Sequence, residues 1–221
     1  MIYVTGDIHG DRSRLAPSAL RALKKGDVLI VAGDFGFIWD DSKSERKYLE
    51  SLGKRDYEIW FLDGAHENFE LLNSYEVIPR LGGRMRQIGM GLYHLPRGEI
   101  YTVEGCRIFV MGGGSLAETA DFESVGSNIP DRDELSEAAR RIAASGYETD
   151  YIITHEPPGK TKDWLSAGAA PLTSLSVWLD ELEKRCKYKK WYFGSVHRDV
   201  SVSDRQTAVY RNIIPLAGAD K

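Results

Sequence analysis

Four of the five histidines in this 221-residue sequence lie just past short apolar segments that we expect to be β-strands. These are His9, His66, His155 and His197, and each has a glycine, a glutamate or an arginine beside it. Ligands bind at strand ends in open α/β sheets, and imidazole is a common ligand of divalent metal ions. This placement therefore favours a metal site over histidines scattered through a core.

Asp7 and His9 form an Asp-x-His motif directly after the first expected strand. Residues two apart on an extended chain point to the same side, so a carboxylate and an imidazole converge there, as in many metal sites. The motif is common, and alone it also fits an aspartate that caps a helix starting near Asp11 and a locally bonded histidine. Gly33-Asp34 follows the second strand, where glycine permits a sharp exit and the carboxylate lies at the sheet edge. Taken alone, that dipeptide is better interpreted as a plain turn.

His66 precedes Glu67, which opens an expected helix. A helix N-terminus there would favour an anion such as phosphate, whereas the plainer alternative is that Glu67 complements the helix dipole. His155 and His197 follow two expected strands in the last third of the chain. Their plainer alternatives are a loop histidine and a strand-end side chain that faces solvent. Each signal is weak by itself, and the prediction depends on their order and common placement.

In the first third of the chain, expected strands alternate with expected helices, and these elements must position the residues described above. Short apolar segments predict strands, and stretches with helical spacing or many charges predict helices. The strands are expected at Ile2–Thr5, Val28–Ala32 and Glu58–Leu62, and the helices at Arg12–Lys25 and Ser42–Leu52. Buried apolar strands separated by helices favour an α/β fold with parallel strands.

The middle of the chain changes character, because glycines divide it into short segments typical of an antiparallel meander. These segments are Arg84–Ile88, Leu92–Leu95, Ile100–Val103 and Arg107–Met111. A polar loop at Gly112–Pro130 has a length that is often functional. The last third returns to strands at Tyr151–Thr154, Trp191–Phe193, around Val200 and at Thr207–Ile214, with helices at Asp131–Ser145 and Leu172–Cys186. Asp131 is the expected N-cap of the first of these helices.

The composition is that of a globular protein, with 42% hydrophobic and 28% charged residues. A net charge of -4 does not support non-specific binding to nucleic acids or membrane surfaces as the main activity. Cys106 and Cys186 are too few for a disulfide framework, so a reducing compartment is the default. The N-terminus lacks the features of a secretory signal, and no apolar run has the length of a membrane span. We expect a cytoplasmic protein with one domain over residues 1–221 and no membrane partner, and the sequence leaves its oligomeric state open.

Five motifs, taken in order, resemble those of the calcineurin-like metallophosphoesterases. They are Asp7-x-His9-Gly10, Gly33-Asp34, Gly64-Ala65-His66-Glu67, His155 and Gly194-Ser195-Val196-His197. The family pattern is D-x-H, G-D, G-N-H-[DE], H and G-H-x-H, and the segment around Val-Ala-Gly-Asp-Phe-Gly is similar to a small bacterial and phage-type branch. The resemblance extends from Asp7 to His197 and implies a four-layer α-β-β-α sandwich.

The resemblance also implies two divalent metal ions about 4 Å apart, which clamp a phosphate and activate water. Oxygen and imidazole ligands suit manganese, iron or zinc. By similarity, the first ion would be held by Asp7, His9, Asp34 and His197.

Further roles follow from the same resemblance. Asp34 would bridge to the second ion, and His155 would be a ligand of that ion. His66 would contact the phosphate or protonate the leaving group.

Arg12, Arg97 and Arg198 lie beside motif segments and could bind phosphate, and Arg198 is the best of the three, although a solvated arginine fits equally well. His94 has no partner motif and is interpreted as structural.

Two positions depart from the family pattern, and both concern the second ion. Ala65 stands where the family has asparagine, and Ser195 stands where it has the first histidine of G-H-x-H. Alanine offers no lone pair, and a neutral hydroxyl is a weaker ligand than imidazole. We therefore expect one tightly bound ion and weak or absent binding of a second. Glu67, Asn68 and Glu156 lie near in sequence and could compensate.

Three explanations of these departures remain open at this point. The chain could be an enzyme that works with one ion, a descendant that keeps only a phosphate- or nucleotide-binding cleft, or a deliberately inactivated form. The main hypothesis is a metal-dependent hydrolase of a phosphomonoester or phosphodiester, with a phosphorylated small molecule or nucleotide as substrate. A nucleic-acid phosphodiester stays among the candidates, although the charge does not indicate it.

Overall fold

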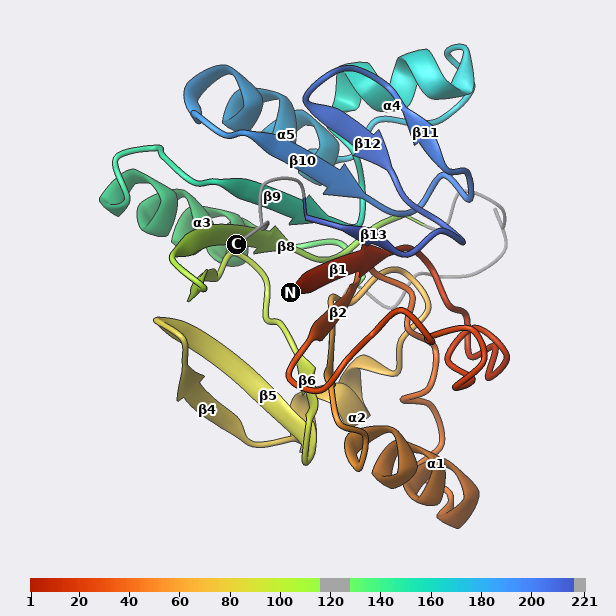
Figure 1. The fold of residues 1–221 in the computed structure, drawn as a ribbon. Coiled ribbons are helices and arrows are strands. Elements are labelled where there is room, and N and C mark those ends of the chain that lie inside the picture. The colour runs from red at the N-terminus through yellow and green to blue at the C-terminus, as the bar shows by residue number, and fades with distance from the viewer. Residues whose placement is uncertain (116–127, 217–221) are drawn as a thin grey trace.

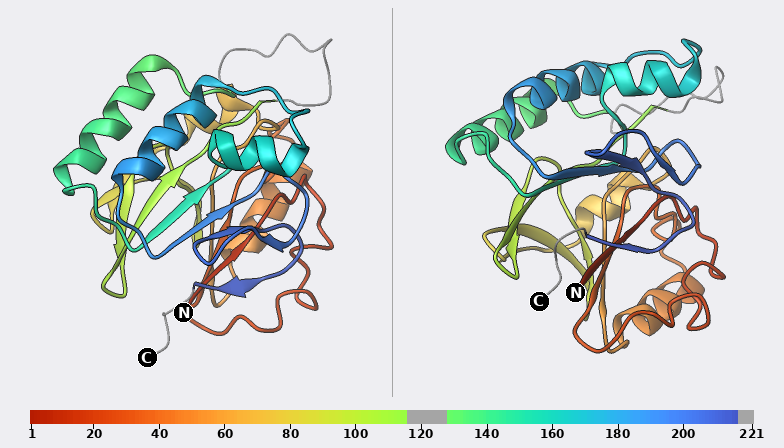
Figure 2. Two further views of the ribbon diagram at one scale, coloured as in Figure 1. Left: turned by 90° about the horizontal axis from the view of Figure 1, so that it is seen from above. Right: turned by 45° about the horizontal axis from the view of Figure 1, so that its top comes forward.

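A computed structural model of the chain describes residues 1–115 and 128–216. Within these residues, two β-sheets lie face to face, and helices cover the outer face of each sheet (Figure 1, Figure 2). The predicted α/β class and the four-layer α-β-β-α sandwich are therefore confirmed.

The first sheet combines parallel strands in its middle with antiparallel strands at both edges. In order across the sheet, its strands are β13 (Ile214–Pro215), β1 (Ile2–Thr5), β2 (Val28–Val31), β3 (Glu58–Phe61), β6 (Leu92–His94), β5 (Gly83–Gly89) and β4 (Val77–Arg80). β1, β2 and β3 pair in parallel, as expected for the first third of the chain. β6 continues this parallel set beside β3, although its sequence segment was expected in an antiparallel meander.

The second sheet has the same general plan. In order, its strands are β11 (Val200–Ser201), β12 (Gln206–Ala208), β10 (Lys190–Phe193), β9 (Tyr151–Thr154), β8 (Cys106–Met111) and β7 (Ile100–Val103). β12, β10, β9 and β8 pair in parallel, and antiparallel strands lie at the two edges.

Both faces of each sheet are buried, which explains why the central strands are apolar throughout. Ile30 in β2 and Ile153 in β9 belong to the core between the sheets. Their neighbours Leu29 and Ile152 point the opposite way and belong to the cores beneath the outer layers. All four side chains are fully buried.

Five helices lie within the described residues: α1 (Lys43–Gly53), α2 (Phe69–Ser74), α3 (Arg132–Ala144), α4 (Gly159–Ser166) and α5 (Ser174–Arg185). α1 and α2 lie on the outer side of the first sheet, whereas α3, α4 and α5 cover the second (Figure 1). The side chain of Ser42 caps α1, and Asp131 caps α3 in a capping box with Glu134. None of these helices combines the length and apolarity that a membrane span requires.

The prediction of a helix at Arg12–Lys25 is wrong. The segment is a series of turns in which most backbone hydrogen bonds join residues three apart. Pro17 has no N–H to donate, and it disfavours helical geometry at Ala16. Leu15 and Leu20 are nevertheless buried against the first sheet, and this burial produced the helix-like spacing.

The predicted meander is instead two hairpins that lie in different sheets. β5 and β6 pair in the first sheet, whereas β7 and β8 pair in the second. The chain crosses between the sheets through a segment that contains Pro96 and Gly98, and neither residue supports continued pairing. The segment expected as one strand at Thr207–Ile214 is also divided between the sheets, because β12 lies in the second sheet and β13 in the first. Most of the predicted loop at Gly112–Pro130 lies outside the described residues.

Candidate metal centre

Parallel strands of both sheets end at one edge of the sandwich. In the first sheet, Thr5 pairs with Val31 and Val31 with Phe61, so β1, β2 and β3 end level with one another. In the second sheet, Thr154 at the end of β9 pairs with Phe193 at the end of β10. The segments that follow these five strands carry Asp7, His9, Asp34, His66, His155 and His197, and contacts at hydrogen-bond or ion-pair distance link all six.

Asp7, His9 and His197 form one part of this centre. A ligand atom from each lies within 4.8 Å of the others. Nε2 of His197 is 3.1 Å from Oδ2 of Asp7 and 3.0 Å from Nε2 of His9. The carboxylate is buried, whereas both imidazoles are partly exposed. The site is therefore open to solvent on the histidine side.

Asp34 is the centre of the other part. Its Oδ2 lies 3.0 Å from Nδ1 of His66 and 3.7 Å from Nε2 of both His9 and His155. Its Oδ1 accepts hydrogen bonds from the N–H groups of Ala65 and His66 at 2.7 Å and 2.9 Å. One ligand atom each from His9, Asp34 and His66 also lies within 4.8 Å of the others, so His66 is part of the same cluster of candidate ligands.

The backbone at the centre has an uncommon conformation. His9, Asp34, Ser195 and His197 all have positive φ, between 46° and 59°. Non-glycine residues persist in this conformation only where their surroundings enforce it, and such residues cluster at functional sites. The N–H groups of Ile8 and His9 both donate to the carbonyl oxygen of Asp34, at 2.9 Å and 2.8 Å, and hold the first two motifs together.

His155 connects the two sheets at this edge. This histidine is only 2% exposed, and its Nδ1 donates a hydrogen bond to the carbonyl oxygen of Ala32 at 3.1 Å. Nε2 is therefore left to face Asp34, which is the orientation that metal-binding histidines adopt. Gly33, with φ 98°, passes so close to this ring that a Cβ there would collide with it.

The carboxylates and imidazoles of the centre shift one another's pKa toward the charged form. Burial raises the pKa of Asp34, but the charge of His155 and the bonds from His66 outweigh burial and hold that pKa well below its usual range. Burial lowers the pKa of His155, but Asp34 and Asp7 together raise it above the usual value. The hydrogen bond to Asp34 raises the pKa of His66, and the contact with Asp7 raises that of His197. A carboxylate that stays ionised in a buried site favours a bound cation.

The donor set fits a divalent metal ion. Oδ2 of Asp7 is buried, and apart from its contact with His197 no described residue offers it a hydrogen bond. Carboxylate oxygens and imidazole nitrogens are the ligands that first-row divalent metals take.

Comparison with known proteins places this arrangement in a family. A family model described as calcineurin-like phosphoesterase matches residues 1–199, a range that includes all six residues of the centre. The chain belongs to the calcineurin-like phosphoesterase family. Its general activity is therefore that of a metal-dependent phosphoesterase, and the family uses divalent metals.

A solved structure shares the calcineurin-like phosphoesterase fold of this chain. It is the phosphopantetheinyl hydrolase PptH from Mycobacterium tuberculosis, with a TM-score of 0.54 and 16% sequence identity. The similarity covers 95% of this chain and 89% of that one. At this identity, the likeness shows the fold alone. No curated protein is a significant match.

Ala65 and Ser195, which depart from the calcineurin-like phosphoesterase motifs, contact the centre through their backbones. The N–H of Ala65 donates to Oδ1 of Asp34 at 2.7 Å, and the N–H of Ser195 donates to Oδ1 of Asp7 at 3.1 Å. Both bonds are independent of side-chain type, so either substitution can be accommodated without moving the aspartates.

The three nearby residues that could compensate for a lost ligand differ in how far other contacts occupy them. Oε1 of Glu67 accepts from the N–H of Phe35 at 2.7 Å, and Asn68 caps α2. Glu156 is 2% exposed, and its carboxylate bonds Lys162 at 3.1 Å and, through Ser115 and Thr173, two further segments. These contacts account for Asn68 and Glu156 without a metal ligand role, whereas Oε2 of Glu67 is buried with no hydrogen-bond partner among the described residues.

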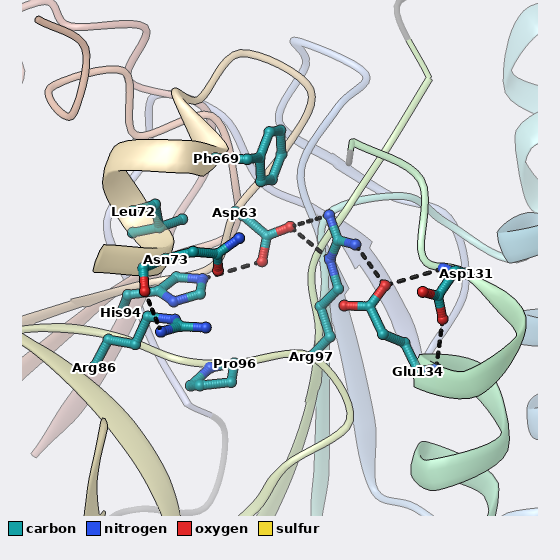
Figure 3. A pocket seen from close by; sticks show the side chains of 10 residues that line it. All are labelled: Asp63, Phe69, Leu72, Asn73, Arg86, His94, Pro96, Arg97, Asp131 and Glu134. Carbon is teal, nitrogen blue, oxygen red and sulfur yellow. Dashed lines mark hydrogen bonds and ion pairs between the residues drawn. The ribbon is translucent and has the colours of Figure 1, made fainter. Parts of the chain in front are cut away.

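His94 belongs to a buried ion-pair network next to the centre. Its Nε2 lies 3.0 Å from Oδ1 of Asp63, whose Oδ2 pairs with Arg97 at 2.8 Å. Figure 3 shows Asp63 between these two side chains, with Glu134 of α3 on the far side of Arg97, at the wall of a cavity of about 250 Å³. His94 thus has the structural contacts that its isolation in the sequence indicated, and Arg97 is paired with carboxylates.

Arg198 and Arg12 differ in their surroundings. Arg198 is exposed and donates to the carbonyl oxygen of Leu165 at 3.0 Å, so much of its guanidinium faces solvent beside His197. Arg12 lies over the ring of Tyr48, 4.5 Å from its centroid.

Sequence reasoning missed one residue at the edge of the centre. The ring of Tyr210 lies 5.2 Å from that of His197, centroid to centroid. Tyr210 stands outside every motif, so no local signal identified it.

Proposed function

We propose that this protein hydrolyses a phosphomonoester or phosphodiester at the centre formed by Asp7, His9, Asp34 and His197. The convergence of these four side chains from the ends of β1, β2 and β10 is the observation that carries the proposal. A divalent ion held there, as manganese, iron or zinc, would polarise the phosphoester and activate water. His155 would add its Nε2 on the side of Asp34.

His66 is the proposed proton donor. Its ring lies beside Asp34, with Nδ1 3.0 Å from Oδ2, and the hydrogen bond between them raises the pKa of His66 above its usual value. In the hydrolysis, a water oxygen bonds to phosphorus and gives up a proton to solvent, while the bond from phosphorus to the alcohol oxygen breaks. His66 gives its proton to this alcohol oxygen and is reprotonated from solvent. Arg198 is placed to bind a non-reacting phosphate oxygen.

We further propose that one ion binds tightly and a second weakly or not at all. Ala65 and Ser195 replace two ligands of the family pattern, both of the second ion, and the nearby side chains of Asn68 and Glu156 are engaged elsewhere. The same observation favours a second candidate function, a catalytically impaired relative that binds a phosphate or a nucleotide.

Metal stoichiometry tests both proposals. The protein is loaded with manganese and desalted, its metal content is measured by elemental analysis, and hydrolysis of p-nitrophenyl phosphate and bis-p-nitrophenyl phosphate is assayed. We expect one ion per chain with measurable turnover, and two ions with faster turnover in the variant Ala65→Asn, Ser195→His. Two ions in the unaltered protein would contradict the weak second site.

Asp34→Asn is the test of the centre itself. Because the buried carboxylate would be a metal ligand, its loss should lower kcat/KM at least about 100-fold. Unchanged metal-dependent turnover would refute the assignment. Absence of turnover in the unaltered protein, together with saturable binding of a nucleotide, would favour the impaired relative.

A further inference from the structure

A groove of about 590 Å³ adjoins the candidate metal centre. Its lining residues come from α4, from the segment after β10 and from the segment before β13: Trp164, Leu165, His197, Arg198, Asp199, Val200 and Tyr210. Since His197 belongs to both the centre and the groove, a group in the groove lies within reach of a phosphate at the centre. We call this the Trp164 groove.

One wall of the Trp164 groove is anchored to the end of β1. The carbonyl oxygen of Tyr210 accepts hydrogen bonds from the Thr5 hydroxyl at 3.0 Å and from the Gly6 N–H at 3.1 Å. The carboxylate of Asp199 accepts the N–H of Tyr210 at 2.8 Å and that of Arg211 at 3.0 Å. These bonds fix the tyrosine against the motif that carries Asp7, so the wall is rigid relative to the centre.

The other wall comes from α4. Arg198 donates to the carbonyl oxygen of Leu165 at 3.0 Å and joins the end of this helix to the segment after His197. No described carboxylate forms an ion pair with Arg198, so its positive charge is available to a ligand. The groove thus combines a free cation with an aromatic wall.

Trp164 is the unusual residue of this wall. It is 66% exposed, although tryptophan is among the residues with the most apolar surface to bury. Tyr210 is already engaged by His197 and by Arg14, which lies 5.3 Å from its ring centroid. Within the described part of the chain, no ring or cation contacts the indole of Trp164. An uncovered indole at the mouth of a groove that leads to a metal centre is suited to stacking on a planar ring.

We propose that the Trp164 groove binds the organic group of the substrate and that a planar ring of this group, a nucleobase or an aryl ring, stacks on Trp164. The inference rests on the proposed function, because it assumes that a phosphate occupies the centre. Arg198 lines the same groove next to His197 and would bind the negative charge that a nucleotide or aryl phosphate carries. Ring-bearing phosphoesters are therefore preferred over aliphatic ones.

The test compares substrates within each variant. kcat and KM are measured for a nucleoside monophosphate, for p-nitrophenyl phosphate and for glycerol phosphate, with the unaltered protein, Trp164→Ala and Trp164→Phe. Loss of a stacking partner should lower kcat/KM about tenfold for ring-bearing substrates, through KM. Glycerol phosphate should change less than about twofold, and Trp164→Phe should retain most of the ring preference. A loss confined to the nucleotide or to the aryl phosphate identifies which ring the groove takes.

Trp39→Ala is the matched control, because Trp39 is 61% exposed but lies outside the groove. It should leave all three substrates unchanged. An equal loss for all three substrates in Trp164→Ala, or the same ring-specific loss in Trp39→Ala, would overturn the proposal. So would dissociation of a dimer in Trp164→Ala by analytical ultracentrifugation, since the indole would then cover a second copy.

A binding measurement separates this inference from the proposed function. Calorimetry with a nucleoside monophosphate and with inorganic phosphate does not require turnover. If the unaltered protein hydrolyses nothing but binds the nucleotide more tightly than phosphate, and Trp164→Ala removes that difference, the groove is supported and hydrolysis is not. If nucleotide and phosphate bind equally in both proteins, the groove proposal fails whatever the activity.

Discussion

Gly33 is a position in the candidate metal centre where the structure leaves no room for a side chain. Its φ of 98° and its approach to the His155 ring exclude a side chain on two independent grounds. We expect Gly33→Ala to lower the free energy of unfolding by about 2–4 kcal/mol, since backbone strain and displacement of a buried ring add. It should also weaken manganese binding. Urea denaturation and metal titration measure the two effects.

Gly26→Ala is the control for this prediction. Gly26 has a φ of 83°, but a Cβ there would meet nothing within 4 Å. It should therefore show only the backbone cost, about 1–2 kcal/mol, with unchanged metal binding. Equal effects of the two variants would mean that contact with His155 does not matter.

The sequence predicted the six residues of the centre because each belongs to a motif at a strand end. It could not predict Tyr210 or the engagement of Glu156, because both depend on contacts between segments far apart in the chain. The Thr5 bond to Tyr210, for example, joins residues 205 positions apart.

The helix caps are features that the sequence predicts well at the scale of elements. Asp131 accepts the N–H groups of Asp133 and Glu134, both at 2.8 Å, as its position before the helical pattern indicated. Asp131→Ala should cost about 1 kcal/mol of stability, whereas Asp131→Asn should cost a few tenths, because asparagine is an equally good N-cap. Urea midpoints compare the two variants. A similar loss in both would assign the effect to charge instead of capping.

The segment at Arg12–Lys25 shows where element prediction fails. Burial of Leu15 and Leu20 follows from the sequence, but Pro17 decides that turns, not a helix, accomplish it. The prediction of one meander was wrong for a different reason. Each was visible as a pair of short strands, yet local pattern does not say to which of two sheets a hairpin belongs.

At the scale of the whole molecule, the network of Asp63, His94 and Arg97 connects the first sheet to α3 and makes stability depend on pH. Burial raises the pKa of Asp63, but Arg97 and His94 outweigh it and hold that pKa well below its usual range. A depressed carboxyl pKa contributes stability that is present above the unfolded-state value of about 3.9 and is lost as pH falls through the folded-state value.

Asp63→Asn isolates this contribution. The stability difference between the unaltered protein and this variant should shrink as pH falls from about 5 to about 3. In this range the unfolded state of the unaltered protein takes up a proton on Asp63, whereas asparagine takes up none. Unfolding curves in urea at several pH values provide the difference. A difference that stays constant across this range would mean that the pKa of Asp63 is the same in the folded and the unfolded state.

The placement of β13 has a consequence for how the chain is made. β1 is made before its antiparallel partner at Ile214–Pro215, so one edge of the first sheet stays open until that later segment has been made. An open strand edge is a template for pairing with other chains. A nascent chain of this protein can therefore pair with another chain along β1 until Ile214–Pro215 is in place, and a chaperone that shields this edge would prevent such pairing.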